Sequence, residues 1–279
     1  MQQYRLNRLF HPGSGRCLDV AVDHGCMGEA AMLRGIEDMP AAIDVLVAAA
    51  PDAIQLTVGQ APLLQARPGR DKPALVLRLD TANVYSPDPA SELFSLIVDD
   101  AVDQAVRLDA ACVVVNLLDV PDHPELRRDC LDNVTRVQAA CARAGMPLMV
   151  EPLAFAPATG AYDTVGDVER IVGLVRQAVE LGADVIKADP TDDLAAFGRV
   201  VRAAAPAPVL VRGGGRVPDE ELFGRTRTLL DHGARGVVYG RNIFQHTAPA
   251  AMTRALLALL HDDVSADRAG AVLADAQAA

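Results

Sequence analysis

One of the two lysines in this chain, Lys187, has the residue type and the position for nucleophilic chemistry. The sequence has 26 basic residues, of which 24 are arginine and only Lys72 and Lys187 are lysine. An arginine guanidinium does not lose its proton in proteins, so it cannot replace an amine that attacks a carbonyl. Lys187 ends the apolar run 183–187, which predicts a buried strand, and burial favours a neutral, nucleophilic amine. The alternative is a lysine whose ammonium reaches water from the strand end.

Other charged residues follow other strand-like runs. Asp23 follows the run 17–22, Glu151 lies near the end of 147–153, Arg212 ends 209–212 and Arg241 follows 236–239. An unpaired buried carboxylate is costly, so Glu151 needs a partner such as Lys187 or a substrate hydroxyl. Each residue also has a purely structural interpretation. Asp23 would then cap a turn and Glu151 would belong to a supporting ion pair, while His24, next to Asp23, is better explained as a hydrogen-bonded loop residue.

Strand-like and helical segments alternate along the whole chain, and several of the strands are continuous apolar runs typical of parallel strands covered on both faces. The predicted strands are 17–22, 53–58, 74–79, 111–118, 147–153, 185–188, 209–212 and 236–239. The predicted helices are 39–50, 90–108, 124–144, 168–181, 191–204 and 219–232, with short ones at 60–65 and 243–246.

This alternation predicts an α/β protein with a single (β/α)8 TIM barrel domain over residues 1–279 and an extra C-terminal helix within 262–279. The alternative is an open, doubly wound sheet, which usually has a glycine-rich fingerprint after its first strand. Residues 23–28 read DHGCMG, which is not that fingerprint. In a barrel the C-terminal ends of the strands meet at one face, so the charged residues at the strand ends are expected to lie close together.

The composition excludes several classes of partner. The net charge of -11 argues against nucleic acid or an anionic membrane as a partner, because both require a basic surface. No apolar stretch is long enough to span a membrane, and residues 1–10 lack the apolar core of a signal peptide, so we expect a cytoplasmic protein. The five cysteines have no CxxC spacing and the six histidines form no HxH or HExxH pair, so we expect neither metal nor cofactor.

Glycine-rich turns follow the last two predicted strands. Gly213, Gly214 and Gly215 can expose backbone N–H groups, and Gly240 and Arg241 precede the short predicted helix 243–246. Barrels of this kind often bind phosphate after strands seven and eight, where such turns and a helix N-terminus favour an anion. The sequence therefore predicts a phosphate site at this place.

With these residues in view, the chain resembles the DhnA-type class I aldolases, which include archaeal-type fructose-bisphosphate aldolases and the thiolase of autoinducer-2 phosphate breakdown. The motifs are RLNRLFHPGSGRCLDVAVDHG, LGADVIKADPTDD, PVLVRGGGRVP and GARGVVYGRNIFQH, and the resemblance extends over residues 5–268. It implies a (β/α)8 barrel, a Schiff-base lysine at Lys187, a catalytic acid at Asp23 and homo-oligomers. It also implies a phosphate cradle at Gly213, Gly214, Gly240 and Arg241.

The chain departs from this family at two places. Archaeal-type aldolases carry an aromatic pair with a proton-donating tyrosine after strand five, where this chain has Glu151-Pro152-Leu153. That stretch is more similar to tagatose-bisphosphate and sulfofructose-phosphate aldolases, in which a glutamate transfers the proton. Arg212 stands where relatives have a small residue. It would either bind a second anion, such as a carboxylate, sulfonate or phosphate, or crowd out the usual phosphate.

We therefore expect a Schiff-base aldolase that reversibly cleaves a phosphorylated ketose or related keto-sugar, including sulfo- or carboxy-sugar phosphates. Lys187 would form the imine, Glu151 would transfer the protons, and Asp23 would orient substrate hydroxyls or assist dehydration of the carbinolamine. The substrate and its phosphate would be bound by Arg212, Gly213, Gly214, Gly240 and Arg241. Two alternatives are a thiolase that transfers an acyl group from a 2,4-diketone phosphate to coenzyme A, and a non-catalytic barrel that binds a sugar phosphate. An unrelated phosphate-binding isomerase or lyase is a further alternative.

Overall fold

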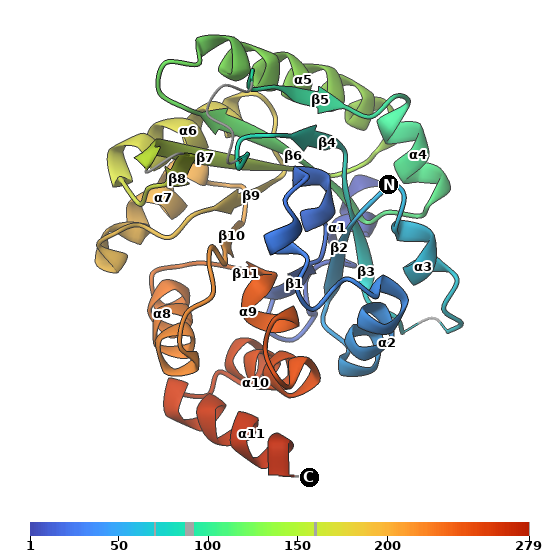
Figure 1. The fold of residues 1–279 in the computed structure, drawn as a ribbon, viewed down its shortest axis with the longest axis vertical. Helices are drawn as coiled ribbons and strands as arrows, with labels where there is room; N and C mark the ends of the chain where they lie inside the picture. The colour runs from blue at the N-terminus through green and yellow to red at the C-terminus, as the bar shows by residue number, and fades with distance from the viewer. Residues whose placement is uncertain (70, 87–91, 159–160, 279) are drawn as a thin grey trace.

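Eight parallel strands form the centre of the protein (Figure 1). The computed structural model describes residues 1–278 except 70, 87–91 and 159–160. The eight strands are β1 (Cys17–Ala21), β2 (Ala53–Thr57), β3 (Ala74–Arg78), β6 (Cys112–Asp119), β7 (Leu148–Ala158), β9 (Val185–Ala188), β10 (Val209–Arg212) and β11 (Gly236–Tyr239). All eight predicted strands are present, and the last three have the predicted bounds.

The pairing of the strands closes the sheet into a barrel. The order is β6-β3-β2-β1-β11-β10-β9-β7, and β6 also pairs with β7, with Asn116 opposite Glu151. The predicted (β/α)8 barrel is therefore confirmed. β7 extends beyond the barrel and forms an antiparallel hairpin with β8 (Ala161–Thr164). A second small antiparallel pair, β4 (Asp80–Ala82) with β5 (Ser95–Ile97), follows β3.

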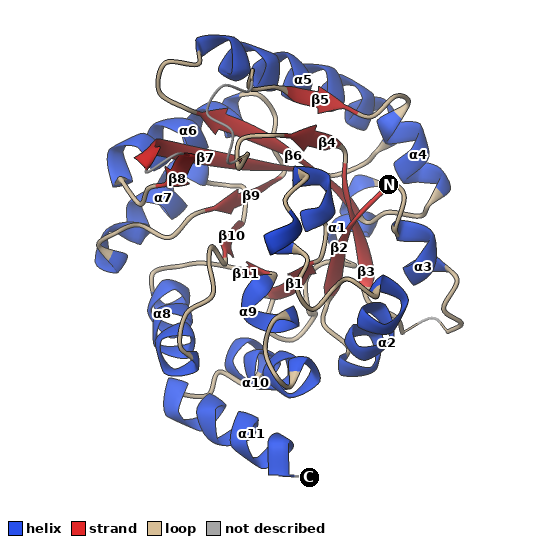
Figure 2. Ribbon diagram, viewed as in Figure 1, coloured by secondary structure: helices blue, strands red, loops and turns tan. Residues whose placement is uncertain are grey.

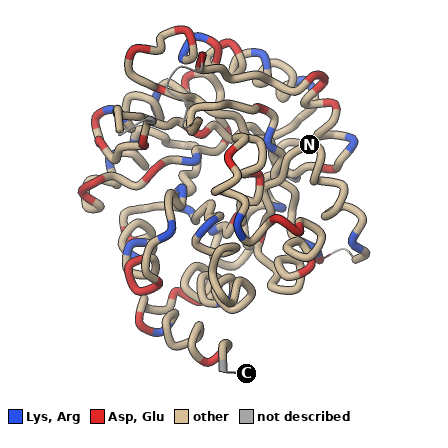
Figure 3. Tube along the Cα trace, viewed as in Figure 1, with Lys and Arg blue, Asp and Glu red and all other residues tan. Residues whose placement is uncertain are grey.

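Helices surround the barrel (Figure 2). They are α1 (Gln2–Leu6), α2 (Met39–Ala49), α3 (Ala61–Gln65), α4 (Ala101–Arg107), α5 (Pro124–Ala144), α6 (Val168–Glu180), α7 (Phe197–Ala204), α8 (Asp219–Asp231), α9 (Arg241–Phe244), α10 (Pro249–His261) and α11 (Ala266–Ala278). The predicted extra helix is α11, which packs against α8 and α10. Figure 3 shows acidic and basic positions interspersed over the helical layer. Among the described residues, no helix is long and apolar enough to cross a membrane.

The predicted helix 90–108 is wrong in its first half. Residues 90 and 91 lie outside the described residues, Ser95–Ile97 is strand β5, and the helix begins at Ala101 after Asp100, whose φ is +50°. Ser95 is buried, and the Asn133 side chain of α5 donates to its carbonyl at 3.1 Å and to its hydroxyl at 3.2 Å. Pairing with β4 and these hydrogen bonds hold the segment extended, which a local helical pattern does not reveal.

Three other segments differ from prediction. The predicted helix 191–204 is a 3-10 turn, Leu194–Ala196, followed by α7, and α9 begins two residues before the predicted helix 243–246. α1 and α10 were not predicted.

The interior of the barrel changes character along its axis, because side chains in a strand alternate between its two faces. Near the N-terminal ends of the strands the inward residues are small or apolar, and Leu9 packs among them. These residues are Cys17, Ala53, Ala74, Val76, Cys112, Val114, Met149, Val185 and Leu210. Towards the C-terminal ends the same strands carry buried polar and charged residues: Asp19, Gln55, Arg78, Asn116, Glu151 and Lys187. The fold thus gathers charge at one end of the barrel.

Candidate active site

Lys187 is buried inside the C-terminal end of the barrel. It lies on β9, one period-2 step after the inward-facing Val185, and is 4% exposed. Its Nζ lies 3.0 Å from Oε2 of Glu151 and donates to Oε1 of Gln55 at 3.4 Å. The ammonium does not reach water, so the interpretation of Lys187 as a surface charge at a strand end does not hold.

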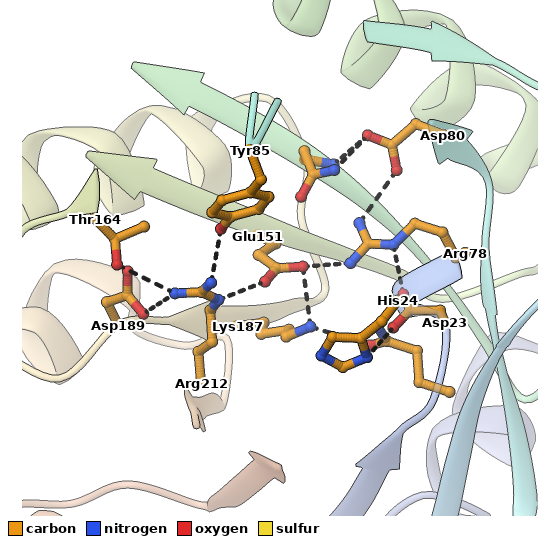
Figure 4. Close-up of polar contacts among 12 residues, drawn as sticks. Asp23, His24, Arg78, Asp80, Tyr85, Glu151, Thr164, Lys187, Asp189 and Arg212 are labelled. Atoms are coloured by element: carbon orange, nitrogen blue, oxygen red, sulfur yellow. Dashed lines mark hydrogen bonds and ion pairs between the residues drawn. The ribbon is translucent and has the colours of Figure 1, made fainter. Parts of the chain in front are cut away.

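Glu151 lies among three cations (Figure 4). Besides Lys187, the guanidinium of Arg78 bonds its Oε2, and Nε of Arg212 lies 3.2 Å from its Oε1. Burial by itself would raise the pKa of this carboxyl, but Lys187, Arg78 and Arg212 together lower it to about 2. Glu151 is therefore ionised, and it is the carboxylate nearest to the Lys187 amine.

Arg78 on β3 was not selected from the sequence, although it is the hub of the site. It is 2% exposed; its Nε lies 2.9 Å from Oδ2 of Asp23 and its Nη1 3.1 Å from Oδ1 of Asp80, in addition to its bond with Glu151. Burial opposes its charge, but these three carboxylates hold its pKa well above the ordinary value. A signal was available, because an arginine at the end of the apolar run 74–79 is as unusual as the glutamate after 148–150.

Asp23 lies immediately after β1, and its Oδ2 accepts a 2.6 Å hydrogen bond from Nε2 of Gln55. Burial would raise its pKa, but Arg78 and Lys187 hold it well below its ordinary range. The ring of His24 lies 3.9 Å from Asp23 and has a pKa of about 4, mainly because burial disfavours the charged ring and despite the opposing effect of Asp23. Asp23 is thus ionised and His24 is neutral.

Arg212 at the end of β10 uses all three of its side-chain nitrogens. Nη1 lies 2.7 Å from Oδ1 of Asp189, Nη2 donates to the Tyr85 hydroxyl at 2.7 Å and Nε faces Glu151. Burial opposes its charge, yet Asp189, Tyr85 and Glu151 raise its pKa. Tyr85 follows β4 outside the barrel, so only the tertiary structure brings it to this site. We call Asp23, Arg78, Asp80, Glu151, Lys187, Asp189 and Arg212 the ion-pair cluster.

The turns after β10 and β11 have little room for side chains. A Cβ on Gly213 would lie 2.9 Å from Cδ1 of Tyr239, and one on Gly240 would lie 2.5 Å from Cε1 of His24 and 2.6 Å from the Ala21 carbonyl oxygen. Gly214 has a φ of +63°, which favours glycine. Beside these turns, Arg241 has no carboxylate partner among the described residues, and burial, followed by the charge of Arg212, lowers its pKa. We call Gly213, Gly214, Gly215, Gly240 and Arg241 the glycine side.

All eight residues selected from the sequence line one cavity at this end of the barrel. They are Asp23, Glu151, Lys187, Arg212, Gly213, Gly214, Gly240 and Arg241. The cavity is also lined by residues that the sequence reasoning did not select, among them Arg78, Tyr85 and Asn116. Within the described part of the chain, no three His, Cys, Asp or Glu side chains are placed to hold a metal ion together.

The family of the chain follows from comparison with known proteins. Residues 17–246 match the DeoC/LacD family of aldolases, which covers the barrel strands and the cavity. The chain belongs to this family of aldolases. The enzyme class expected from the sequence, an aldolase and thus a lyase, is confirmed, as is the resemblance to the DhnA-type members.

Two curated relatives of this family member have different activities. One is a 2-amino-3,7-dideoxy-D-threo-hept-6-ulosonate synthase of Halobacterium salinarum, 32% identical over 265 residues that cover 95% of this chain and 93% of the relative. The other is a 3-hydroxy-5-phosphonooxypentane-2,4-dione thiolase of Escherichia coli, 33% identical over 270 residues, 96% of this chain and 84% of the relative. The family is thus established, and the substrate of this aldolase is not fixed by its relatives.

Solved structures agree with this aldolase in fold. An archaeal fructose 1,6-bisphosphate aldolase superposes with a TM-score of 0.75 at 23% identity and covers 94% of this chain and 100% of its own. Another archaeal aldolase, with its catalytic lysine covalently bound to a carbinolamine intermediate, gives a TM-score of 0.76 at 24% identity and 94% coverage of this chain. Both support the barrel architecture.

Proposed function

We propose that this enzyme is a Schiff-base aldolase that forms or cleaves a carbon–carbon bond of a phosphorylated ketose or related keto-sugar through an imine on Lys187. One observation carries the proposal: a buried lysine amine in the cavity lies 3.0 Å from the carboxylate of Glu151. An amine that attacks a carbonyl must lose protons, and an acceptor at hydrogen-bond distance removes them without exchange with water.

The imine forms by a balanced sequence of proton transfers. The Lys187 ammonium first gives a proton to Glu151, the neutral Nζ attacks the ketone carbon, and the ketone oxygen takes that proton back from Glu151 to become the carbinolamine hydroxyl. The nitrogen then loses a second proton to Glu151, which passes it to the hydroxyl, and the hydroxyl leaves as water to give the protonated imine. Lys187 is the strongest of the charges that lower the pKa of Glu151. When this nitrogen is neutral, the pKa of Glu151 rises, so the carboxyl can hold the proton until the hydroxyl needs it.

The protonated imine then accepts the electron pair of the breaking bond. Glu151 removes the proton from the hydroxyl on the far carbon of that bond, and this carbon leaves as an aldehyde. The remaining enamine is protonated on carbon, and water then hydrolyses the imine and releases the second product. Asp23, fixed by Arg78 and Gln55, is placed to accept hydrogen bonds from substrate hydroxyls. The contacts of Arg78 and Arg212 with Glu151 support a positioning role for both arginines on the carboxylate.

The glycine side suits the phosphate of the substrate. The backbone N–H groups of Gly214 and Gly215 donate to no partner among the described residues, and Arg241 beside them carries a charge without a carboxylate. A Cβ at Gly213 would collide with Tyr239 and one at Gly240 with His24 and Ala21, so a larger residue at either position would displace the turn. Exposed N–H groups and a free guanidinium favour a phosphate, and its binding holds the ketone against Lys187.

Borohydride trapping tests the imine directly. We expect the protein, incubated with ketose phosphates and sodium borohydride, to gain the mass of the reduced adduct on the peptide that contains Lys187. Lys72→Arg is the matched control, because Lys72 donates to the backbone carbonyls of Gln65 and Arg67 and is not among the residues that line the cavity. It should trap as the wild type does, whereas Lys187→Met should not. Binding of a ketose phosphate without any adduct on Lys187 would refute the proposal.

The thiolase activity is the second candidate, because a relative with that printed activity shares 33% identity over 96% of this chain. Incubation with 3-hydroxy-5-phosphonooxypentane-2,4-dione and coenzyme A distinguishes the two. Formation of an acyl-CoA, with no aldehyde released from any ketose phosphate, would favour the thiolase. Aldehyde release without acyl-CoA formation would favour the aldolase.

A further inference from the structure

The cationic residues of the cavity differ in whether they have acidic partners. The lining holds five basic side chains: His24, Arg78, Lys187, Arg212 and Arg241. His24 is neutral, with a pKa of about 4 because of burial. Arg78 pairs with Asp23, Asp80 and Glu151, Lys187 pairs with Glu151, and Arg212 pairs with Glu151 and Asp189. Among the described residues, Arg241 alone of these cations has no carboxylate within ion-pair distance.

The ion-pair cluster contains more carboxylates than cations. With every group in its charged form, it holds four carboxylates (Asp23, Asp80, Glu151, Asp189) and three cations (Arg78, Lys187, Arg212). Its net charge is therefore negative. A second anionic group of the substrate placed here would meet carboxylates, and a buried like-charge contact is strongly unfavourable.

Arg212 can turn to an anion only by abandoning buried partners. Asp189 is 5% exposed and pairs with Arg212 alone among the described residues, so it would be left as an unpaired charge out of contact with water, and Glu151 would lose one of its three cations. Breaking a buried ion pair from one side costs far more than an exposed contact returns. Arg212 therefore bridges the carboxylates of Glu151 and Asp189. These contacts do not support the expectation from the sequence that it binds a second anion.

The remaining unsatisfied group favours a neutral, hydroxylated substrate end. Asn116 lines the cavity, and its Oδ1 is a buried acceptor without a hydrogen-bond partner among the described residues. An acceptor without a partner is satisfied by an O–H donor and not by an anion, which has no hydrogen to donate. Positive charge without a partner thus lies on the glycine side, and an acceptor without a partner lies beside the ion-pair cluster.

We infer that the substrate is a keto-sugar with a single phosphate and an uncharged polyol end. Its phosphate is held at Arg241 and the glycine side. Sugar bisphosphates and sugar phosphates with a carboxylate or sulfonate at the other end are then disfavoured. This inference rests on the proposed aldolase function and specifies its substrate class.

Pairs of sugars that differ only in the second phosphate test this inference. The probes are fructose 1-phosphate against fructose 1,6-bisphosphate and tagatose 1-phosphate against tagatose 1,6-bisphosphate, each measured by turnover and by concentration-dependent borohydride trapping at Lys187. We expect the monophosphate of each reactive pair to have a kcat/KM about tenfold higher or more. Trapping at Lys187 with equal or better use of the bisphosphate would overturn the inference and leave the imine chemistry intact. No trapping by any probe would overturn the proposed function, and this inference with it.

Two variants locate the effect. Arg241→Gln should weaken trapping of the monophosphate about tenfold or more. Arg216→Gln, which removes the same charge from an exposed arginine that bonds the Gln245 carbonyl, should not. Asp189→Asn removes one carboxylate from Arg212 and should reduce the preference for the monophosphate. The ratio of the two substrates is measured within one preparation, so lost stability does not alter it. An unchanged ratio in Asp189→Asn, or unchanged binding in Arg241→Gln, would contradict the inference.

Discussion

The two sides of the cavity differ in whether their cationic side chains have carboxylate partners. In the ion-pair cluster, each of Arg78, Lys187 and Arg212 lies within 3.2 Å of a carboxylate oxygen, and Glu151 pairs with all three. On the glycine side of the same cavity, Arg241 has no such partner among the described residues, and the backbone N–H groups of Gly214 and Gly215 have none there either. The contrast is between charge that is already compensated and charge that awaits a ligand.

The difference shows why charged residues in one site cannot be assigned roles from their type. A compensated cation fixes the position and the pKa of its partners, and it is costly to divert to a ligand. An uncompensated cation contributes to binding because the ligand supplies its missing partner. By this criterion we propose that Arg78 and Arg212 position the catalytic groups and that Arg241 binds the substrate.

The largest effect should come from neutralising the carboxylate at the centre of the ion-pair cluster. Glu151→Gln removes the proton acceptor beside Lys187, and we expect kcat to fall about 10²–10⁴-fold, the range of general acid–base catalysis. Asp23→Asn, which leaves that acceptor in place, should lose less. Steady-state kinetics of the two amide variants decides between them, and wild-type activity in Glu151→Gln would remove Glu151 from the mechanism.

Removing the hub of the cluster should destabilise the protein. Arg78→Met leaves three buried carboxylates without their shared cation, and we expect the free energy of unfolding to fall by about 3–5 kcal/mol. Urea unfolding measures this loss. Arg176→Met is the control, because its exposed pair with Glu180 at 2.8 Å should contribute about 0.5 kcal/mol or less. Equal losses of stability in both variants would mean that the buried ion pairs of Arg78 contribute no more than the exposed pair of Arg176.

Asp19 on β1 is a further buried carboxyl, and the charges of Lys187, Asp23, Arg78 and Glu151 in the ion-pair cluster act on its pKa. Asp19 is fully buried, and both its carboxyl oxygens lack a hydrogen-bond partner. Burial raises its pKa from 3.8 to about 7, even though Lys187 opposes the shift. Because this pKa is higher in the folded state, the folded protein binds the extra proton between these values, and Asp19 costs stability as the pH rises from about 4 to 7.

Asp19→Asn does not titrate, so its stability relative to the wild type should increase from pH 5 to pH 8. About two pKa units of the shift lie between pH 5 and pH 8, which corresponds to a gain of about 3 kcal/mol at most. Urea unfolding at both pH values measures the difference, and the titrations shared by the two proteins cancel. If the stability difference were the same at pH 5 and pH 8, Asp19 would not be the titrating group.

The smallest effect should come from filling the glycine side. Gly240→Ala places a Cβ 2.5 Å from the His24 ring and 2.6 Å from the Ala21 carbonyl. We expect it to destabilise the protein by about 1–3 kcal/mol and to raise KM more than it lowers kcat. Gly173→Ala is the control. Its Cβ meets nothing within 4 Å on helix α6, so it should stabilise the protein slightly. Thermal unfolding and kinetics of both variants provide the test, and an unchanged KM in Gly240→Ala would place phosphate binding elsewhere.

The sequence predicted most of the candidate site, because its residues lie at the ends of strands and the strands are visible as apolar runs. Reading the last residues of the apolar runs selected Lys187, Glu151, Asp23 and Arg212, and all four line the cavity. The same reading applied to the third strand would have added Arg78. The helix predicted at 90–108 failed because pairing of Ser95–Ile97 with β4 outweighs local helical preference.

The sequence by itself determined the eight strands, the face on which their ends converge and the residue types presented there. These depend on local periodicity and on glycines that end helices, which are properties of short segments. Only the tertiary structure decided which charges are compensated. Arg78 and Glu151 are 73 residues apart, and Arg212 and Tyr85 are 127 apart, so their contacts depend on barrel closure and on side-chain reach. Compensation is a property of these distances, and no segment of the chain encodes it alone.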